Sequence, residues 1–418
     1  MTPRRGAPRP LAALGALAAA AALAAAAGCA RPGAPAATPR ADRPYLIGYL
    51  ASWGVRSKGT RIADLPADRL THIFYAFARV GADGRFALAD PCLDVGACGG
   101  AGAPPPDSLG GNFGELRRLK ARYPHLRLLV SAGGWGGSAH FSDAALTPES
   151  RRAFAESGVD LFIRRWPGLF DGIDIDWEFP VAGGLEGNVE RPEDRRNFTL
   201  LLEELRRRLD EQGARDGRRY LLTIAASARP REIANLDLPA IAPLLDLINV
   251  MTYDYHSGSR IAHFNAPLFP AAGDPTPALT IDTSIAVFRR GGVPAAKLLV
   301  GVPFYGRAYG KVPAVDAGLF QPSAGRPEDW KEGAGDYRAL ARERVGAPGY
   351  RRYWSAEAQV PWLYDARTGT WITYDDSASV ARKADYVRDR GLAGVVVWEL
   401  GGDDGTLVPA LYGHLRHR

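Results

Sequence analysis

Three acidic residues stand at alternate positions of one short segment, as Asp174, Asp176 and Glu178. In an extended strand their side chains share one face, and the apolar residues between them share the other. A buried carboxylate is costly unless it is paired, hydrogen-bonded or protonated, and neighbouring carboxylates compete for protons, which separates their pKa values. A glutamic acid kept protonated beside a charged aspartate can act as a general acid. A solvated edge strand is the alternative, but the apolar flanks 169–170 and 179–180 favour a buried central strand.

The elements that would position these acids recur along the chain. Eight short apolar runs have the composition of buried strands, and amphipathic stretches such as 191–212 and 377–390 lie between most of them. This alternation predicts an α/β fold in which parallel strands close into a (β/α)8 TIM barrel, and the chain length fits one barrel with insertions. The predicted strands are 45–50, 71–78, 126–132, 170–179, 220–226, 245–253, 297–304 and 392–399.

The interval between the seventh and eighth predicted strands is too long for a simple loop. Residues 306–376 are rich in glycine and aromatic residues, and 360–374 has the pattern of a β-hairpin with a turn near 366–369. A disordered loop is the alternative, which the aromatic content disfavours. The sequence therefore predicts a small α+β insertion domain between strands 7 and 8.

Polar and aromatic residues gather at the ends of the predicted strands, where the active site of such a barrel forms. Trp135 follows the third strand, Tyr253 and Asp254 end the sixth, and Trp398 ends the eighth. Aromatic rings stack on the C–H faces of sugars, and carboxylates hydrogen-bond sugar hydroxyls, so this combination suits a carbohydrate. Each tryptophan has a core position as its alternative, but a strand end close to glycine favours a cleft.

Four motifs at these positions carry a specific resemblance. They are DGIDIDWE at 171–178, SAGG at 131–134, MTYD at 251–254 and GVPFYGR at 301–307. In this order they resemble the signatures of glycoside hydrolase family 18, the chitinases, and the last is similar to chitinases that carry an insertion domain. The resemblance runs from about residue 43 to the C-terminus and implies a catalytic barrel over 44–418.

The resemblance implies a retaining, substrate-assisted hydrolysis of β-1,4 links after N-acetylglucosamine, in which one enzyme acid suffices. Glu178 would be the general acid and base, and Asp176 would orient the acetamido group and balance the positive charge of the intermediate. Asp174 would modulate the proton of Asp176, and Tyr253 would hydrogen-bond the acetamido oxygen. The remaining implied substrate-binding residues are Asp254, Trp398, Trp135, Tyr49, Arg307 and Met251.

Three functions stay open at this stage. The first is an exported chitinase acting on chitin or N-acetylglucosamine oligosaccharides. The second is an endo-β-N-acetylglucosaminidase acting on N-glycans or a peptidoglycan-type polymer. The third, from another class, is a non-catalytic chitin-binding lectin, which the intact acids disfavour. No metal or other cofactor is expected, and the scattered basic residues behind the net charge of +6 give no nucleic-acid footprint. We expect a monomer.

The first residues have the pattern of an export signal. Arginines precede an Ala/Leu run that ends near Gly28, so we expect a signal peptide over 1–28 and a flexible linker over 29–43. Cys29 lies where a lipoprotein would be acylated, and a lipid anchor at Cys29 and plain secretion both remain open; the anchor would be the only membrane contact. Cys92 and Cys98 lie close together in a glycine-rich loop and could form a disulfide in an oxidising compartment.

Overall fold

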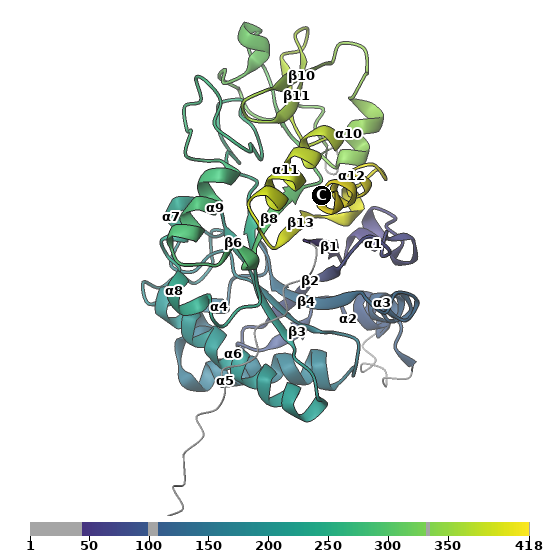
Figure 1. Ribbon diagram of the computed structural model, residues 1–418, viewed down its shortest axis with the longest axis vertical. Helices are drawn as coiled ribbons and strands as arrows, with labels where there is room; N and C mark the ends of the chain where they lie inside the picture. Colours follow the sequence, from purple (N-terminus) through teal and green to yellow (C-terminus); the bar gives the residue numbers. More distant parts are fainter. Residues whose placement is uncertain (1–43, 99–107, 332–334, 418) are drawn as a thin grey trace, which may run out of the picture. The chain divides into compact units, whose positions relative to one another are not determined.

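The computed structural model describes residues 44–98, 108–331 and 335–417 (Figure 1). The predicted signal peptide 1–28, the linker 29–43 and Cys29 lie outside the described residues. Within the described part, no helix is long and apolar enough to cross a membrane.

Eight parallel strands close into a barrel, as the sequence predicts. Neighbouring strands are hydrogen-bonded in the order β1-β13-β8-β7-β6-β5-β4-β2, and a further pairing of β1 with β2 closes the ring. A short strand, β3 (Phe86–Leu88), adds to β2 in the antiparallel sense. The barrel strands are β1 (Tyr45–Ala51), β2 (His72–Val80), β4 (Arg127–Gly133), β5 (Gly172–Asp176), β6 (Leu221–Ser227), β7 (Leu247–Met251), β8 (Leu298–Pro303) and β13 (Gly394–Trp398).

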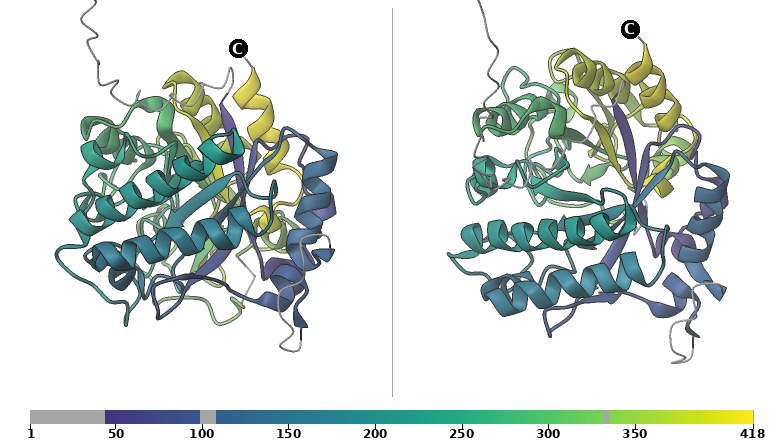
Figure 2. Two further views of the ribbon diagram at one scale, coloured as in Figure 1. Left: turned by 90° about the horizontal axis from the view of Figure 1, so that it is seen from below. Right: turned by 60° about the horizontal axis from the view of Figure 1, so that its bottom comes forward.

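Helices connect the strands and cover the outside of the barrel. Figure 2 shows two long helices, α5 and α6, side by side along one flank. Helix α5 ends at Gly158, and a turn of π-helix, Val159–Arg164, continues directly from it. The helices outside the insertion are α1 (Gly54–Ser57), α2 (Pro91–Val95), α3 (Gly111–Arg122), α4 (Phe141–Leu146), α5 (Pro148–Gly158), α6 (Asp194–Asp216), α7 (Pro230–Ile233), α8 (Leu238–Ile241), α9 (Ile281–Arg290), α11 (Ser377–Asp389) and α12 (Leu407–Arg416).

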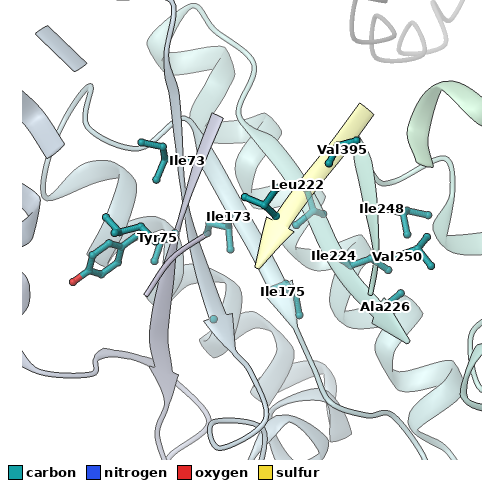
Figure 3. Close-up of a cluster of buried hydrophobic side chains, with 14 of the residues drawn as sticks. Ile73, Tyr75, Ile173, Ile175, Leu222, Ile224, Ala226, Ile248, Val250 and Val395 are labelled. Carbon is teal, nitrogen blue, oxygen red and sulfur yellow. The ribbon is translucent and has the colours of Figure 1, made fainter. Parts of the chain in front are cut away.

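The two faces of β5 differ as the alternation predicts. Ile173 and Ile175 point outward into the core between strands and helices, where they lie among apolar residues of β6 and β7 (Figure 3). Trp177 continues this face and stacks on Phe141, with ring centroids 5.5 Å apart. The opposite face carries the acids into the barrel interior. Burial of the apolar face therefore fixes the direction in which the acids point.

The segment between β8 and β13 forms its own antiparallel sheet, in the order β10-β11-β12-β9 (Figure 1). The predicted hairpin is the pair β11 and β12, joined after Asp365 and before Thr370. Its inner face is aromatic, with Trp371 fully buried. The elements of the insertion are β9 (Arg307–Tyr309), α10 (Tyr337–Glu343), β10 (Arg351–Ser355), β11 (Val360–Asp365) and β12 (Thr370–Thr373).

A disulfide joins Cys92 to Cys98 around the short helix α2. Asp90 caps this helix by accepting hydrogen bonds from the backbone N–H groups of Cys92 and Leu93, both at 3.0 Å. The disulfide closes a small loop in the chain segment that connects β2 to β4.

Candidate active site

Asp174 is the innermost of the three acids and is fully buried on β5. Three hydroxyl groups donate hydrogen bonds to its carboxylate: Ser131 Oγ at 2.7 Å, Thr223 Oγ1 at 2.5 Å and Tyr49 OH at 2.9 Å. Burial raises the pKa of Asp174, and these three donors oppose the rise. The donors come from β4, β6 and β1, so the barrel holds this carboxylate in one orientation.

Asp176, at the end of β5, has a different environment. Its Oδ1 atom is buried and has no hydrogen-bond partner among the described residues. Burial raises the pKa of Asp176 well above its ordinary value, and the charges of Glu178 and Asp174 raise it further. A buried acceptor without a donor is costly, so this oxygen is suited to a donor supplied by a ligand.

The glycines after β4 allow the chain to pack against Asp176. Gly133 has φ +109°, and a Cβ atom there would lie 2.1 Å from the carbonyl oxygen of Asp176. Gly134 donates its backbone N–H to the same oxygen at 2.8 Å. A side chain at 133 would push the two strand ends apart, and a Cβ atom at 134 would lie 2.5 Å from the Phe77 ring, which explains the Gly-Gly pair of the motif in physical terms.

Glu178 follows β5 and is half-buried at the rim of the barrel. Ser138 Oγ accepts a hydrogen bond from the backbone N–H of Glu178 at 2.9 Å, and Asn188 Nδ2 donates to its carbonyl oxygen at 3.1 Å. Burial raises the pKa of the Glu178 carboxyl to about 8, and the charge of Asp254 adds to the rise. The carboxyl is therefore largely protonated at neutral pH, as a general acid must be.

Tyr253 and Asp254 extend from β7 toward the acids. The phenol pKa of Tyr253 is raised by burial and then by the charges of Asp176 and Glu178, so its hydroxyl is a donor at neutral pH. Asp254 forms a two-point ion pair with Arg307, with Nη2 to Oδ2 at 2.5 Å and Nε to Oδ1 at 2.6 Å. Arg307 is the first residue of β9, so the pair links the insertion to the end of β7.

An aromatic row lies across the barrel mouth. The indole of Trp398 stacks on Phe77, with centroids 5.5 Å apart and planes at 20°, and it lies 5.3 Å from the Tyr49 ring. Trp53 extends the row, 6.4 Å from Trp398, and is 45% exposed. These rings offer an apolar platform beside the carboxylates.

A pocket of about 200 Å³ opens over Trp398 and is rich in charged side chains. Among the predicted site residues, Met251 is half-buried at the end of β7, and Trp135 is 50% exposed in the loop after β4. The residues that line the pocket are Lys58, Asp254, Phe304, Tyr305, Arg307, Asp336, Trp398 and Glu399.

Several of these residues were not singled out from the sequence. Thr223 donates a hydrogen bond to Asp174 from the interior face of β6. Trp53 lies just after β1, so the rule that active sites form at strand ends could have found it. Lys58 and Asp336 belong to none of the motifs in the sequence, so no sequence signal indicated them. Among the residues that the structure describes, no group of three His, Cys, Asp or Glu side chains is placed to hold a metal ion.

A family model described as glycosyl hydrolases family 18 matches residues 45–403, which include the barrel and the insertion. The chain belongs to this family. This match confirms the predicted resemblance to family 18. The predicted barrel fold is also confirmed, because solved structures of chitinases match this chain along most of its length.

Three known proteins illustrate the similarity of this family 18 hydrolase. Chitinase A1 from Niallia circulans is 38% identical over 408 residues, which cover 88% of this chain and 58% of the relative. The structure of chitinase ChiA74 from Bacillus thuringiensis matches with a TM-score of 0.82 at 36% identity, over 89% of this chain and 70% of that chain. A family 18 N-acetylglucosaminidase from Paenibacillus barengoltzii matches with a TM-score of 0.75 at 35% identity, over 89% of this chain and 99% of that chain.

Proposed function

We propose that the protein is a chitinase that hydrolyses β-1,4 links between N-acetylglucosamine units with retention, using the substrate's acetamido group as the nucleophile. The observation that carries the proposal is the pairing of Glu178, with a pKa raised to about 8, and Asp176, with a buried oxygen that lacks a donor. The named relatives include a chitinase at 38% identity, which supports the substrate class.

In the first step Glu178 donates its proton to the glycosidic oxygen, and the bond from the anomeric carbon to that oxygen breaks. The acetamido carbonyl oxygen forms a new bond to the anomeric carbon, which gives an oxazolinium ion. The Asp176 carboxylate accepts the amide N–H and balances the positive charge, and Tyr253 donates to the attacking oxygen and orients it.

In the second step a water molecule attacks the anomeric carbon, and Glu178, now a carboxylate, takes a proton from that water. The oxazolinium ring opens, the acetamido group is restored, and two inversions give the retained configuration. Asp174 touches no substrate atom in this scheme. It acts as a positioning residue that shares the interior of the barrel with Asp176.

The test is hydrolysis of N-acetylglucosamine oligomers by the purified protein, with separated products and with the anomeric form of the new reducing end read by NMR. The proposal requires cleavage with the β-anomer formed first. An α-anomer, or no cleavage of any acetylated oligomer, would reject it.

A second candidate is release of N-acetylglucosamine from chain ends or from other glycans. The structural match to an N-acetylglucosaminidase at 35% identity supports it. Incubation with chitin oligomers, an N-glycan and peptidoglycan separates the candidates, because a chitinase yields oligomeric products from chitin and leaves the other two intact. A non-catalytic lectin would bind the oligomers and leave all three uncleaved.

We also propose that the protein is exported as a monomer, either released after removal of residues 1–28 or anchored through acylated Cys29. Membrane fractionation of the expressing cells, combined with mass spectrometry of the mature N-terminus, distinguishes the two forms. An N-terminus that retains residues 1–28 would contradict both.

A further inference from the structure

Asp254 has an unusual backbone conformation. Its φ angle is +58°, in the left-handed region that residues with a Cβ atom rarely adopt. Such a conformation is costly and persists only where the surrounding structure enforces it. Asp254 also belongs to the site, because its charge adds to the rise in the pKa of Glu178. The contacts that hold Asp254 in place therefore bear on the acid that the proposed mechanism needs.

Three side chains from outside β7 hold three different groups of Asp254. Arg307, the first residue of β9, binds the carboxylate at two points. Arg229, just after β6, donates from Nη2 to the carbonyl oxygen of Asp254 at 2.7 Å. Asn265, in the segment between β7 and α9, accepts the backbone N–H of Asp254 on its Oδ1 atom at 3.1 Å. The backbone is thus fixed on both sides of the left-handed residue.

The side chain of Asn265 is buried for the sake of this one contact. The residue is 2% exposed, and its Nδ2 atom is buried without a hydrogen-bond partner among the described residues. Burying an amide group is costly unless it is hydrogen-bonded. Within the described part of the chain, the bond from Asp254 is the side-chain hydrogen bond that offsets this cost. Asn265 is therefore placed for Asp254 rather than for packing.

The backbone of Asn265 is in turn tied to the insertion. Its N–H donates to Thr373 Oγ1 at 2.8 Å, and Thr373, the last residue of β12, is 1% exposed. Thr373 pairs with Arg307 in the register between β12 and β9. Two paired residues of the insertion sheet therefore reach Asp254, one directly and one through Asn265. A displacement of this sheet edge would move both the carboxylate and the backbone of Asp254.

We propose that Asn265 is a positioning residue of the active site: it ties the backbone of Asp254 to the insertion, so that the Asp254 charge stays beside Glu178. Without this hydrogen bond Asp254 would leave its left-handed conformation, and its carboxylate would move away. The insertion thus acts on the chemistry of the barrel and not only on the shape of the groove. This inference rests on the proposed function, in which Glu178 is the acid.

Other ionisable groups also face Glu178. Asp176, on β5, and the phenol of Tyr253, after β7, both interact electrostatically with it. The guanidinium of Arg307 accompanies Asp254 as its partner. The hydrogen bond in question holds only Asp254 among these groups. Because the Asp254 charge raises the pKa of Glu178, its displacement lowers that pKa, and kcat/KM should then fall at a lower pH.

The test measures the alkaline fall of kcat/KM on a chitin oligomer. Asn265→Leu keeps a branched side chain but removes the acceptor, so the fall should move down by about 0.5–1 pH unit, the size expected when one nearby charge moves away. At pH 9 this shift equals a roughly three- to tenfold loss of kcat/KM beyond any loss at pH 6. Asp254→Asn removes the charge itself and should move the fall at least as far.

Substitutions in β12 provide matched controls. Thr373→Val removes the hydroxyl that holds Asn265 and should shift the fall in the same direction, whereas Thr373→Ser keeps the hydroxyl and should keep the wild-type profile. Thr370→Val makes the same replacement at the other end of β12, where the hydroxyl bonds only to Thr368, and should also keep the wild-type profile. Thermal denaturation of each variant measures its loss of stability separately.

A fall that coincides with wild type in Asn265→Leu or Thr373→Val would overturn the proposal, since lost stability alone lowers the rate at every pH. An equal shift in Thr373→Ser would overturn it as well. NMR titration of the Glu178 carboxyl, in protein with isotope-labelled glutamate and with Glu178→Gln to identify the signal, should show the same shift without substrate. If wild-type protein cleaves no acetylated oligomer, the proposed function is rejected, and this titration alone decides whether Asn265 holds the Asp254 charge.

Discussion

Replacing Glu178 by glutamine is the most direct perturbation of the site. Glutamine has nearly the same shape and can still form hydrogen bonds, but it has no proton to give to the leaving oxygen. A general acid contributes roughly 10²- to 10⁴-fold, which corresponds to about 3–5.5 kcal/mol of transition-state stabilisation. We place the expected loss of kcat at the upper end, because the neighbouring carboxylate Asp254 is bound at two points by Arg307 and is not available to replace Glu178.

The wild-type pH profile follows from the same carboxyl. A pKa of about 8 means that Glu178 is protonated below pH 8 and loses its proton above it, so kcat/KM should fall as the pH rises through about 8. The pKa read from this fall in kcat/KM, which reports the free enzyme, should therefore lie far above the ordinary range for a glutamic acid. The Glu178→Gln variant should lose this limb.

The assay measures initial rates on a chitin oligomer across pH 4 to 10, with oligomer binding to the variant followed by calorimetry. Binding should stay within a few-fold of wild type, because the aromatic row and the Asp254–Arg307 pair are unchanged. Activity of Glu178→Gln within roughly tenfold of wild type would refute the assignment. So would an unchanged alkaline limb in the variant.

Three other perturbations test the surroundings of Glu178. Asp176→Asn should lower kcat more than Asp174→Asn, because only the first contacts the acetamido group in the proposed mechanism; steady-state kinetics with the reverse order would contradict it. Arg307→Lys should weaken oligomer binding severalfold in calorimetry, since lysine cannot reproduce the two-point pair with Asp254; wild-type affinity would count against that role. The free energy of unfolding of Glu178→Gln, relative to that of the wild type, should increase as the pH rises from about 5 to 8. The folded-state pKa of Glu178 lies above its unfolded value, so the folded wild type binds an extra proton in that window and loses stability with rising pH; parallel denaturation curves would disprove this.

The barrel was predictable because each strand is an apolar run of ordinary length and the runs alternate with amphipathic helices. All eight predicted strands overlap observed ones, and the hairpin of the insertion appears as β11 and β12. The short strand β3 was missed, since three residues give no periodicity to read. The π-helical turn after α5 was also missed, because its side chains continue the amphipathic pattern of the helix before it.

The acids of the site could be found from their alternation, but their partners could not. The hydroxyls that hold Asp174 belong to Tyr49, Ser131 and Thr223, which lie on three other strands. Closure of the barrel brings these hydroxyls together, and the register between neighbouring strands decides which interior residues meet. Lys58 is the extreme case, because its two carboxylate partners are 278 and 341 residues away along the chain.

The insertion leaves the barrel after β8 and returns to it at β13, and these two strands are direct neighbours in the ladder. The two ends of the insertion lie side by side at a narrow neck, because Thr373 of β12 pairs with Arg307 of β9 at one strand spacing, roughly 4.8 Å, and the chain then returns through α11 to the start of β13. Because β8 and β13 pair with each other regardless of what joins them, evolution can lengthen, trim or replace the joining segment without opening the ring. Arg307 lies at this neck and pairs with Asp254 at the barrel mouth, so a new segment grafted there would start beside the predicted substrate-binding residues.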